Sequence, residues 1–254
     1  MKYLRIVLLV LTSMVCTGFT CLPRVYTPPV RLWPDETSPM PLAKGENSVS
    51  ATGGWTGGVE VFGGWSAGSG TLAYRRGLLD GVEGGVDISY LRVPTDEYHL
   101  NIEPQAFSVR ASMKASMPKL GRFISARAGV GLGTTGAGQY MGLDLGIILG
   151  WHNPYVVPFV TGGGYVSFPF NARAIIFFPN DSNSTQVYAD NFETTYGIEG
   201  GCGLKYYILS KERQAPNKIS LGVYTVGKVT MLKAEYHDFV EWPVSIGSGV
   251  EVEF

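Results

Sequence analysis

The sequence predicts an all-β protein, an antiparallel transmembrane β-barrel of about ten strands, with eight strands as the alternative. Three observations predict it. Runs of about ten residues alternate apolar and polar side chains up to the C-terminus, which is the period of a strand with two different faces. The 254 residues include 34 Gly and only 16% charged residues, against roughly 25% in soluble domains. The chain ends on an amphipathic strand whose last residue is the aromatic Phe254.

Residues 1–20 are predicted to be an export signal, because a basic start is followed by an apolar core, Ile6 to Leu11. Two processing routes stay open: lipidation of Cys21, or ordinary cleavage near Gly18 or Thr20. A lipoprotein signal has Gly, Ala or Ser before its Cys, which Thr20 does not match, whereas the Pro-rich continuation is typical of lipoproteins.

Residues 21–50 are rich in proline and have little apolar periodicity. Proline at this density removes hydrogen-bond donors and stiffens the chain, so the segment is predicted to be an extended periplasmic linker. Residues 51–254 are predicted to form the barrel. The prolines of the linker are Pro23, Pro28, Pro29, Pro34, Pro39 and Pro41.

Ten runs with turn signals between them are predicted to be strands. The clearest places six apolar side chains in one unbroken row, from Met141 to Trp151, which is typical of a lipid-facing surface that ends at the membrane interface. Proline within the seventh run departs from the pattern, because it cannot donate to the ladder. The runs are 59–62 and 71–75, both weak, then 82–90, 107–114, 123–132, 140–151, 155–166, 196–208, 219–228 and 244–254.

The connections alternate between long and short, which predicts that both ends of the barrel chain lie in the periplasm. The connection at 133–138 is the exception, because it is short where a long one is expected. The longest, 168–191, contains the apolar run Ala174 to Phe178, for which a short extra strand is expected. Burial in the barrel mouth, at the lipid boundary or against a partner is the alternative.

The last strand carries a family resemblance. Val250, Val252 and Phe254 fall on one face, opposite Glu251 and Glu253. This stretch resembles the closing strand of small bacterial outer-membrane β-barrel proteins, which ends in Phe. The resemblance implies a location in the cell outer membrane, in contact with its lipid. It also implies that Val250, Val252 and Phe254 form an assembly signal for the barrel-assembly machinery.

The polar faces of the strands predict a charge network inside the barrel. Six acids and five bases form a nearly balanced set, and unpaired buried charges are costly, so internal pairing is expected. Such side chains fill a narrow barrel, and the single-sign wall of a selective channel is absent from the sequence. The set is Glu83, Asp87, Arg110, Lys114, Arg127, Asp144, Glu199, Lys205, Lys228, Glu251 and Glu253.

The sequence predicts no catalytic residue, cofactor or metal site, and a net charge of −1 argues against nucleic acid as a partner. The leading hypothesis is a non-enzymatic outer-membrane barrel with a structural, surface-interaction or limited small-molecule conduit role. One alternative is a barrel enzyme that uses the loops of His99 and His237, each the end of a Glu-Tyr-His triplet. Another is a surface or periplasmic lipoprotein with a soluble β-fold. Cys202 is expected to face lipid, with a disulfide to Cys21 as the alternative.

Overall fold

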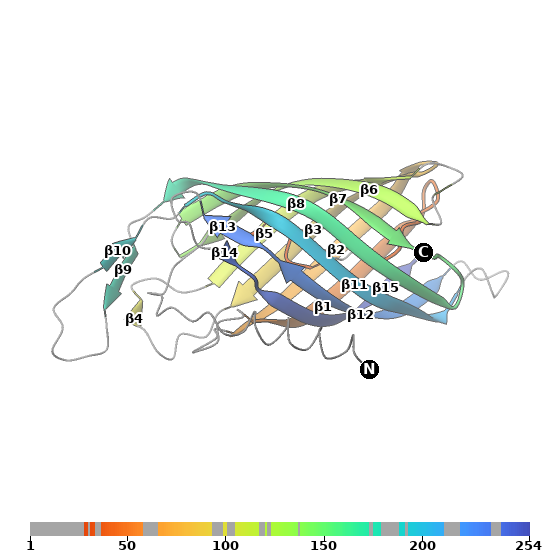
Figure 1. Ribbon diagram of the computed structural model, residues 1–254. Helices are drawn as coiled ribbons and strands as arrows, with labels where there is room; N and C mark the ends of the chain where they lie inside the picture. Colours follow the sequence, from red (N-terminus) through yellow and green to blue (C-terminus); the bar gives the residue numbers. More distant parts are fainter. Residues whose placement is uncertain are drawn as a thin grey trace, which may run out of the picture.

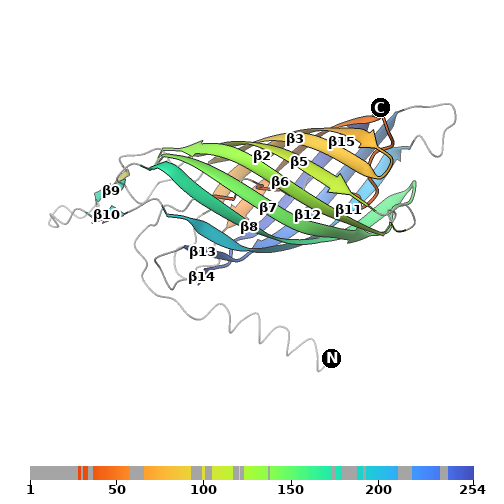
Figure 2. The ribbon, with the colours of Figure 1, turned by 90° about the horizontal axis from the view of Figure 1, so that it is seen from above.

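Ten strands form a closed antiparallel barrel in the computed structural model, which confirms the predicted fold class (Figures 1 and 2). Each barrel strand pairs with its neighbour in the chain, and β15 pairs with β1 from Ser48↔Glu253 to Gly57↔Val244, which closes the sheet. The barrel strands are β1 (Asn47–Gly57), β2 (Ser66–Leu79), β3 (Val82–Arg92), β5 (Gln105–Ala115), β6 (Ile124–Thr135), β7 (Gly138–Gly150), β8 (Val156–Ala172), β11 (Thr195–Leu209), β12 (Ser220–Thr230) and β15 (Val244–Glu253).

The structure describes residues 28–29, 31–33, 37–57, 66–92, 99–100, 105–116, 120, 123–136, 138–172, 175–178, 188–190, 193–210, 219–234 and 240–254. Over these ranges there is no helix with the length and apolar character needed to cross a membrane.

The two ends of the barrel differ in their connections. At one end, called the turn end, β2 and β3 are joined by Asp80 and Gly81, and β7 and β8 by residues 151–155. Asn47 and Phe254 meet there through two backbone hydrogen bonds of 2.8 and 2.9 Å. The positive φ of Gly81, 78°, suits a glycine in this tight turn.

The opposite end, called the loop end, carries the long connections and five short strands. β4 (His99–Leu100), β9 (Ile175–Phe178) and β10 (Tyr188–Asp190) form a separate three-stranded sheet beyond the barrel (Figure 1). β9 is thus the short extra strand expected in the longest loop. β13 (Leu232–Ala234) pairs with β11 and with β14 (Val240–Glu241), next to the ends of β12 and β15.

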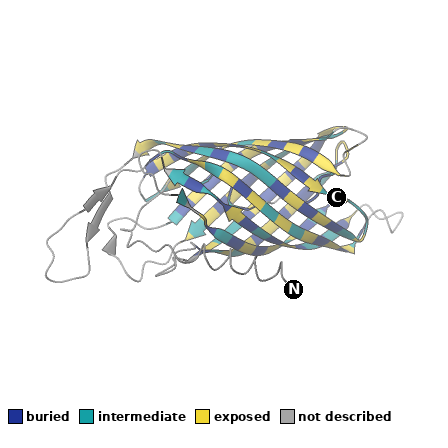
Figure 3. Ribbon diagram, in the orientation of Figure 1, coloured by how far each residue is buried: buried dark blue, intermediate teal, exposed yellow. Residues whose placement is uncertain are grey.

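Alternation along the strands gives the barrel two different surfaces (Figure 3). Aliphatic side chains such as Leu145, Ile198 and Ile246, at 57–67% exposure, form a band around the outside. Exposed aromatic residues flank this band at both ends, which is the arrangement of a lipid-facing wall with two interfacial girdles. Those near the loop end are Trp55, Tyr90, Phe107, Phe168, Phe170, Tyr196 and Trp242, and those near the turn end are Tyr74, Phe123, Trp151, Tyr155, Tyr206 and Phe254.

The first strand is not where the sequence pattern placed it. It was predicted at residues 59–62, which lie outside the described residues, whereas β1 spans Asn47–Gly57. Its inward side chains are Ser48, Ser50 and Thr52. Before Trp55 its outward face carries only one larger apolar side chain, Val49, so the apolar alternation is weak. The second strand is longer than predicted and spans Ser66–Leu79. Pro158 lies in β8 with its side chain outward, and its carbonyl accepts a hydrogen bond from Trp151 N.

Deletion of Phe254 tests whether the closing strand is an assembly signal. We expect outer-membrane levels to fall several-fold, more than the loss of one aromatic side chain, about 1.5–3 kcal/mol, would cause. The missing chain should accumulate as a protease-sensitive periplasmic species. Phe123→Ala is the matched control, because it removes a similarly exposed ring from the turn end but not from the closing strand. Equal outer-membrane levels of the two variants, measured by quantitative blotting, would contradict an assembly signal.

Candidate functional site: the closed barrel interior

The centre of the barrel is crossed by a chain of ion pairs between the walls. Arg110 from β5 donates two hydrogen bonds to Asp144 of β7, at 2.7 and 2.9 Å, and a third to Asp87 of β3 at 2.5 Å. Arg127 from β6 joins Asp144 at 2.8 Å to Glu199 of β11 at 2.6 Å. All five side chains are buried, so these ion pairs cross the middle of the lumen from wall to wall.

The same chain of contacts continues to both ends. Toward the loop end, Lys228 of β12 lies 2.7 Å from Glu199. Toward the turn end, Arg75 of β2 lies 3.7 Å from Asp87 and 3.5 Å from Glu83, which also pairs with Lys114 at 3.0 Å. These contacts extend one continuous ion-pair network, named here the wall network, along most of the lumen.

A second cluster belongs to the closing strands at the turn end. Lys205 of β11 lies 2.9 Å from Glu251 and 2.8 Å from Glu253, both on β15. The Tyr207 hydroxyl donates to Glu253 at 3.0 Å, and the Lys205 ammonium lies 4.4 Å from the centre of the Tyr207 ring. Ser48 of β1 donates to Glu251 at 2.8 Å, so the cluster also links the first and last strands.

Glycine on the inward face leaves room for these long side chains. A Cβ atom at Gly129 would lie 2.3 Å from Arg110 Nε and 2.6 Å from Asp144 Oδ2. A larger residue there would therefore displace the central ion pair. This contact explains why an inward position beside the network carries no side chain.

The interior also holds a segment that the sequence was expected to place outside. Residues 21–50 were predicted to be a periplasmic linker, but Arg31–Trp33 and Thr37–Leu42 lie inside the barrel. We call residues 28–43 the arm. Arg31 is 2% exposed and pairs with Glu199 at 2.8 Å, while Lys228 donates to the carbonyls of Arg31 and Leu32. The prediction failed because it rested on local composition, whereas contacts with distant strands hold the arm.

Trp33 is the largest side chain of the arm and is 1% exposed. Its indole Nε1 donates to Ser69 of β2 at 3.0 Å, and its ring packs with Phe159 and Val226. A Cβ atom at Gly54 would lie 2.6 Å from this ring, and one at Gly247 would lie 2.8 Å from it. The ring therefore packs directly against the backbone of β1 and β15 at these two glycines.

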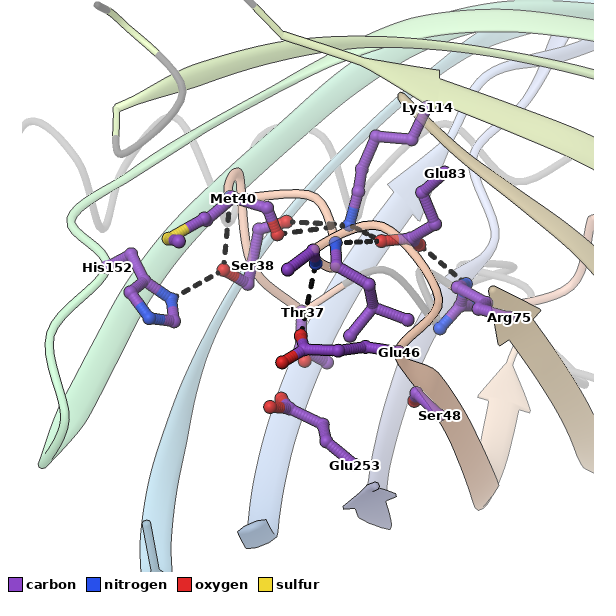
Figure 4. A network of polar contacts seen from close by, with 12 residues as sticks. Thr37, Ser38, Met40, Glu46, Ser48, Arg75, Glu83, Lys114, His152 and Glu253 are labelled. Atoms are coloured by element: carbon purple, nitrogen blue, oxygen red, sulfur yellow. Dashed lines mark hydrogen bonds and ion pairs between the residues drawn. The ribbon is translucent and has the colours of Figure 1, made fainter. Parts of the chain in front are cut away.

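The C-terminal part of the arm makes polar contacts with the strands and connections of the turn end (Figure 4). Thr37 donates to Glu251 at 2.9 Å, and Leu42 N donates to Glu83 at 2.9 Å. Lys114 reaches the Ser38 carbonyl at 3.3 Å, and the Ser38 hydroxyl lies 2.9 Å from His152 Nδ1. A cavity of about 240 Å³ remains beside these residues, with acidic and basic side chains in its lining.

The structure places all eleven side chains of the predicted charge set inside the barrel, and each takes part in an ion pair. Sequence reasoning missed two basic members, Arg75 and Arg31. The sequence pattern could have identified Arg75, because Leu72 and Tyr74 of the same strand point outward and place Arg75 on the inner face. Arg31 could not have been identified in this way, since nothing in its local sequence indicates a partner 168 residues away.

The other predicted residues lie outside this network. Val250 and Phe254 face outward, at 45% and 49% exposure, and their role in assembly stays a prediction. Cys202 is a free, exposed cysteine, and Cys21 lies outside the described residues. The backbone of His99 belongs to β4, and His237 lies outside the described residues. In the part of the chain that the structure describes, no three His, Cys, Asp or Glu side chains gather as a metal site.

No protein-family model matches the chain, and no curated protein matches it in sequence. Several solved structures match over 83% of this chain. Neisserial surface protein A (NspA) is 12% identical, with a TM-score of 0.41 and 100% of that chain covered. The translocator domain of the autotransporter NalP from Neisseria meningitidis is 14% identical, with a TM-score of 0.47 and 88% covered. The outer membrane protease OmpT from Escherichia coli is 10% identical, with a TM-score of 0.29 and 96% covered.

Similarity at this level carries no inference about function. The class of protein follows from the molecule itself: a closed antiparallel barrel with an aliphatic band between two aromatic girdles is an outer-membrane β-barrel. The chain resembles small bacterial members of that class.

Arg110 tests the energetic weight of the wall network. Arg110→Met is expected to lower the free energy of unfolding by about 3 kcal/mol, at the lower end of the range for breaking a buried pair. The loss of stability is limited because Asp87 still pairs with Arg75 and Asp144 still pairs with Arg127. Urea unfolding in detergent measures this change in the free energy of unfolding. Arg76→Met is the control, because Arg76 is exposed on the same barrel and should change stability by less than about 0.5 kcal/mol. Equal effects would show that the network adds nothing to stability.

Gly247 tests the position of Trp33. Gly247→Ala is expected to cost about 1–3 kcal/mol, because the new methyl group overlaps the indole ring. In a Trp33→Ala background the same substitution should cost roughly half as much or less. A double-mutant cycle in urea measures the coupling. Additive effects would mean that Trp33 does not occupy this position.

Proposed function

We propose that the protein is a non-enzymatic outer-membrane β-barrel that works as an anchored surface scaffold, with an interior that is closed to free diffusion. The observation that carries this proposal is the double closure of the lumen. The wall network crosses it at Arg110, Asp144 and Arg127, and the buried Trp33 of the arm occupies it closer to the loop end. A selective channel would instead present a continuous wall of one charge sign around an open path.

The turn end faces the periplasm in this proposal, and the loop end faces outward. Short periplasmic turns and long outer connections are the usual arrangement in outer-membrane barrels. The sheet of β4, β9 and β10 then projects from the outer surface, where it supports a role in surface interactions. Outer-membrane lipid and, during assembly, the barrel-assembly machinery are the proposed partners.

Conductance tests the closed interior. The purified full-length protein, reconstituted in planar bilayers, is expected to give no steady conductance steps, because salt bridges and the arm block the lumen. A variant that lacks residues 28–43 is the comparison. It should still form the barrel, and because the wall network still crosses the lumen it is expected to give at most brief conductance events, when those ion pairs open. Steady, ion-selective steps from the full-length protein would contradict the proposal and favour a conduit.

A further inference from the structure

The arm runs through the barrel in one direction, from the loop end to the turn end. Arg31 contacts Glu199 and Lys228, which lie near the loop-end limits of β11 and β12, Thr195 and Thr230. Trp33 lies against Gly54 and Gly247, close to the loop-end limits of β1 and β15. The N-terminal part of the arm is therefore near the loop end.

The C-terminal part of the arm reaches the turn end. Leu42 contacts Glu83, which follows the tight turn of Asp80 and Gly81. Ser38 contacts His152, which belongs to the connection between β7 and β8. Gly45 N then donates to Gly77 O at 2.8 Å, and the chain reverses into β1.

Between Arg31 and the turn end, the lumen holds the wall network and the rest of the described arm. Pro28, the first described residue of the arm, is buried. The cavity at the turn end, about 240 Å³, is bordered by Ser38, Met40 and Leu42 of the arm itself.

We propose that the chain enters the barrel from its loop end, so that the polypeptide on the N-terminal side of Pro28 is displayed at the cell surface, opposite Phe254. The side of the membrane on which this polypeptide lies depends on the proposed orientation of the barrel. The end of the barrel at which the chain enters does not depend on that orientation. The displayed chain emerges at the same end of the barrel as the sheet of β4, β9 and β10.

Thiol accessibility in intact cells tests this proposal. Three single variants are compared: Pro29→Cys in the half-buried start of the arm, Asn171→Cys at the exposed loop end, and Asp80→Cys at the exposed turn end. Cells are treated with a charged maleimide reagent too bulky to pass through porins, and modified peptides are identified by mass spectrometry, which separates them from those of Cys21 and Cys202. We expect Pro29→Cys and Asn171→Cys to be modified to the same extent in intact and permeabilised cells, and Asp80→Cys only after permeabilisation.

The outcomes separate the two claims. Modification of Pro29→Cys only in permeabilised cells, while Asn171→Cys reacts in intact cells, would overturn the threading. Modification of Asp80→Cys but not Asn171→Cys in intact cells would overturn the orientation, and Pro29→Cys would then show which end it shares. If position 29 reacts in neither sample, Arg24→Cys, farther from the barrel along the chain, gives the same comparison and decides it.

Discussion

Charged side chains inside a narrow membrane barrel must be neutralised, and this requirement governs how the strands and the arm are arranged. An ionised side chain without a partner is costly in such an interior, and a pair is stable only when its geometry is good and its remaining polar atoms are satisfied. The wall network lowers the cost of its buried charges with shared partners. Arg110 binds two carboxylates, Asp144 accepts from two guanidinium groups, and Glu199 is contacted by three basic side chains. The strand register that aligns these residues also sets the outward band that contacts lipid.

Among the described residues, the buried charges on the barrel strands balance without the arm, and one further buried acid, Glu193, lies just before β11. Six basic side chains on the strands, Arg75, Arg110, Lys114, Arg127, Lys205 and Lys228, face the six acids Glu83, Asp87, Asp144, Glu199, Glu251 and Glu253. Arg31 adds a seventh base, and the other charged contacts of the arm use its backbone or Thr37. The barrel therefore provides a complete framework, into which the arm fits mainly through the shape of Trp33 and backbone carbonyls.

The alternation of residue types was enough to predict the barrel and the direction of its strong strands. In β7, Leu143 and Leu145 mark the outer face, so Asp144 between them had to point inward. The same rule failed for β1, because Ser48 and Ala51 differ too little in polarity to mark two faces. The position of the arm could not be predicted at all. A high proline content predicts a stiff, extended chain, which can lie inside a barrel or outside it. Only the contacts of Arg31 and Trp33 with distant strands show that the arm lies inside.

Proton contacts around Trp33 decide whether the arm lies inside the barrel. Nuclear Overhauser spectra of the full-length protein in detergent micelles should show contacts between the indole ring protons of Trp33 and the α-protons of Gly54 and Gly247, since both glycines border that ring. Random-coil chemical shifts for residues 31–33 and 37–42, without any contact from the Trp33 ring to the barrel strands, would contradict the account.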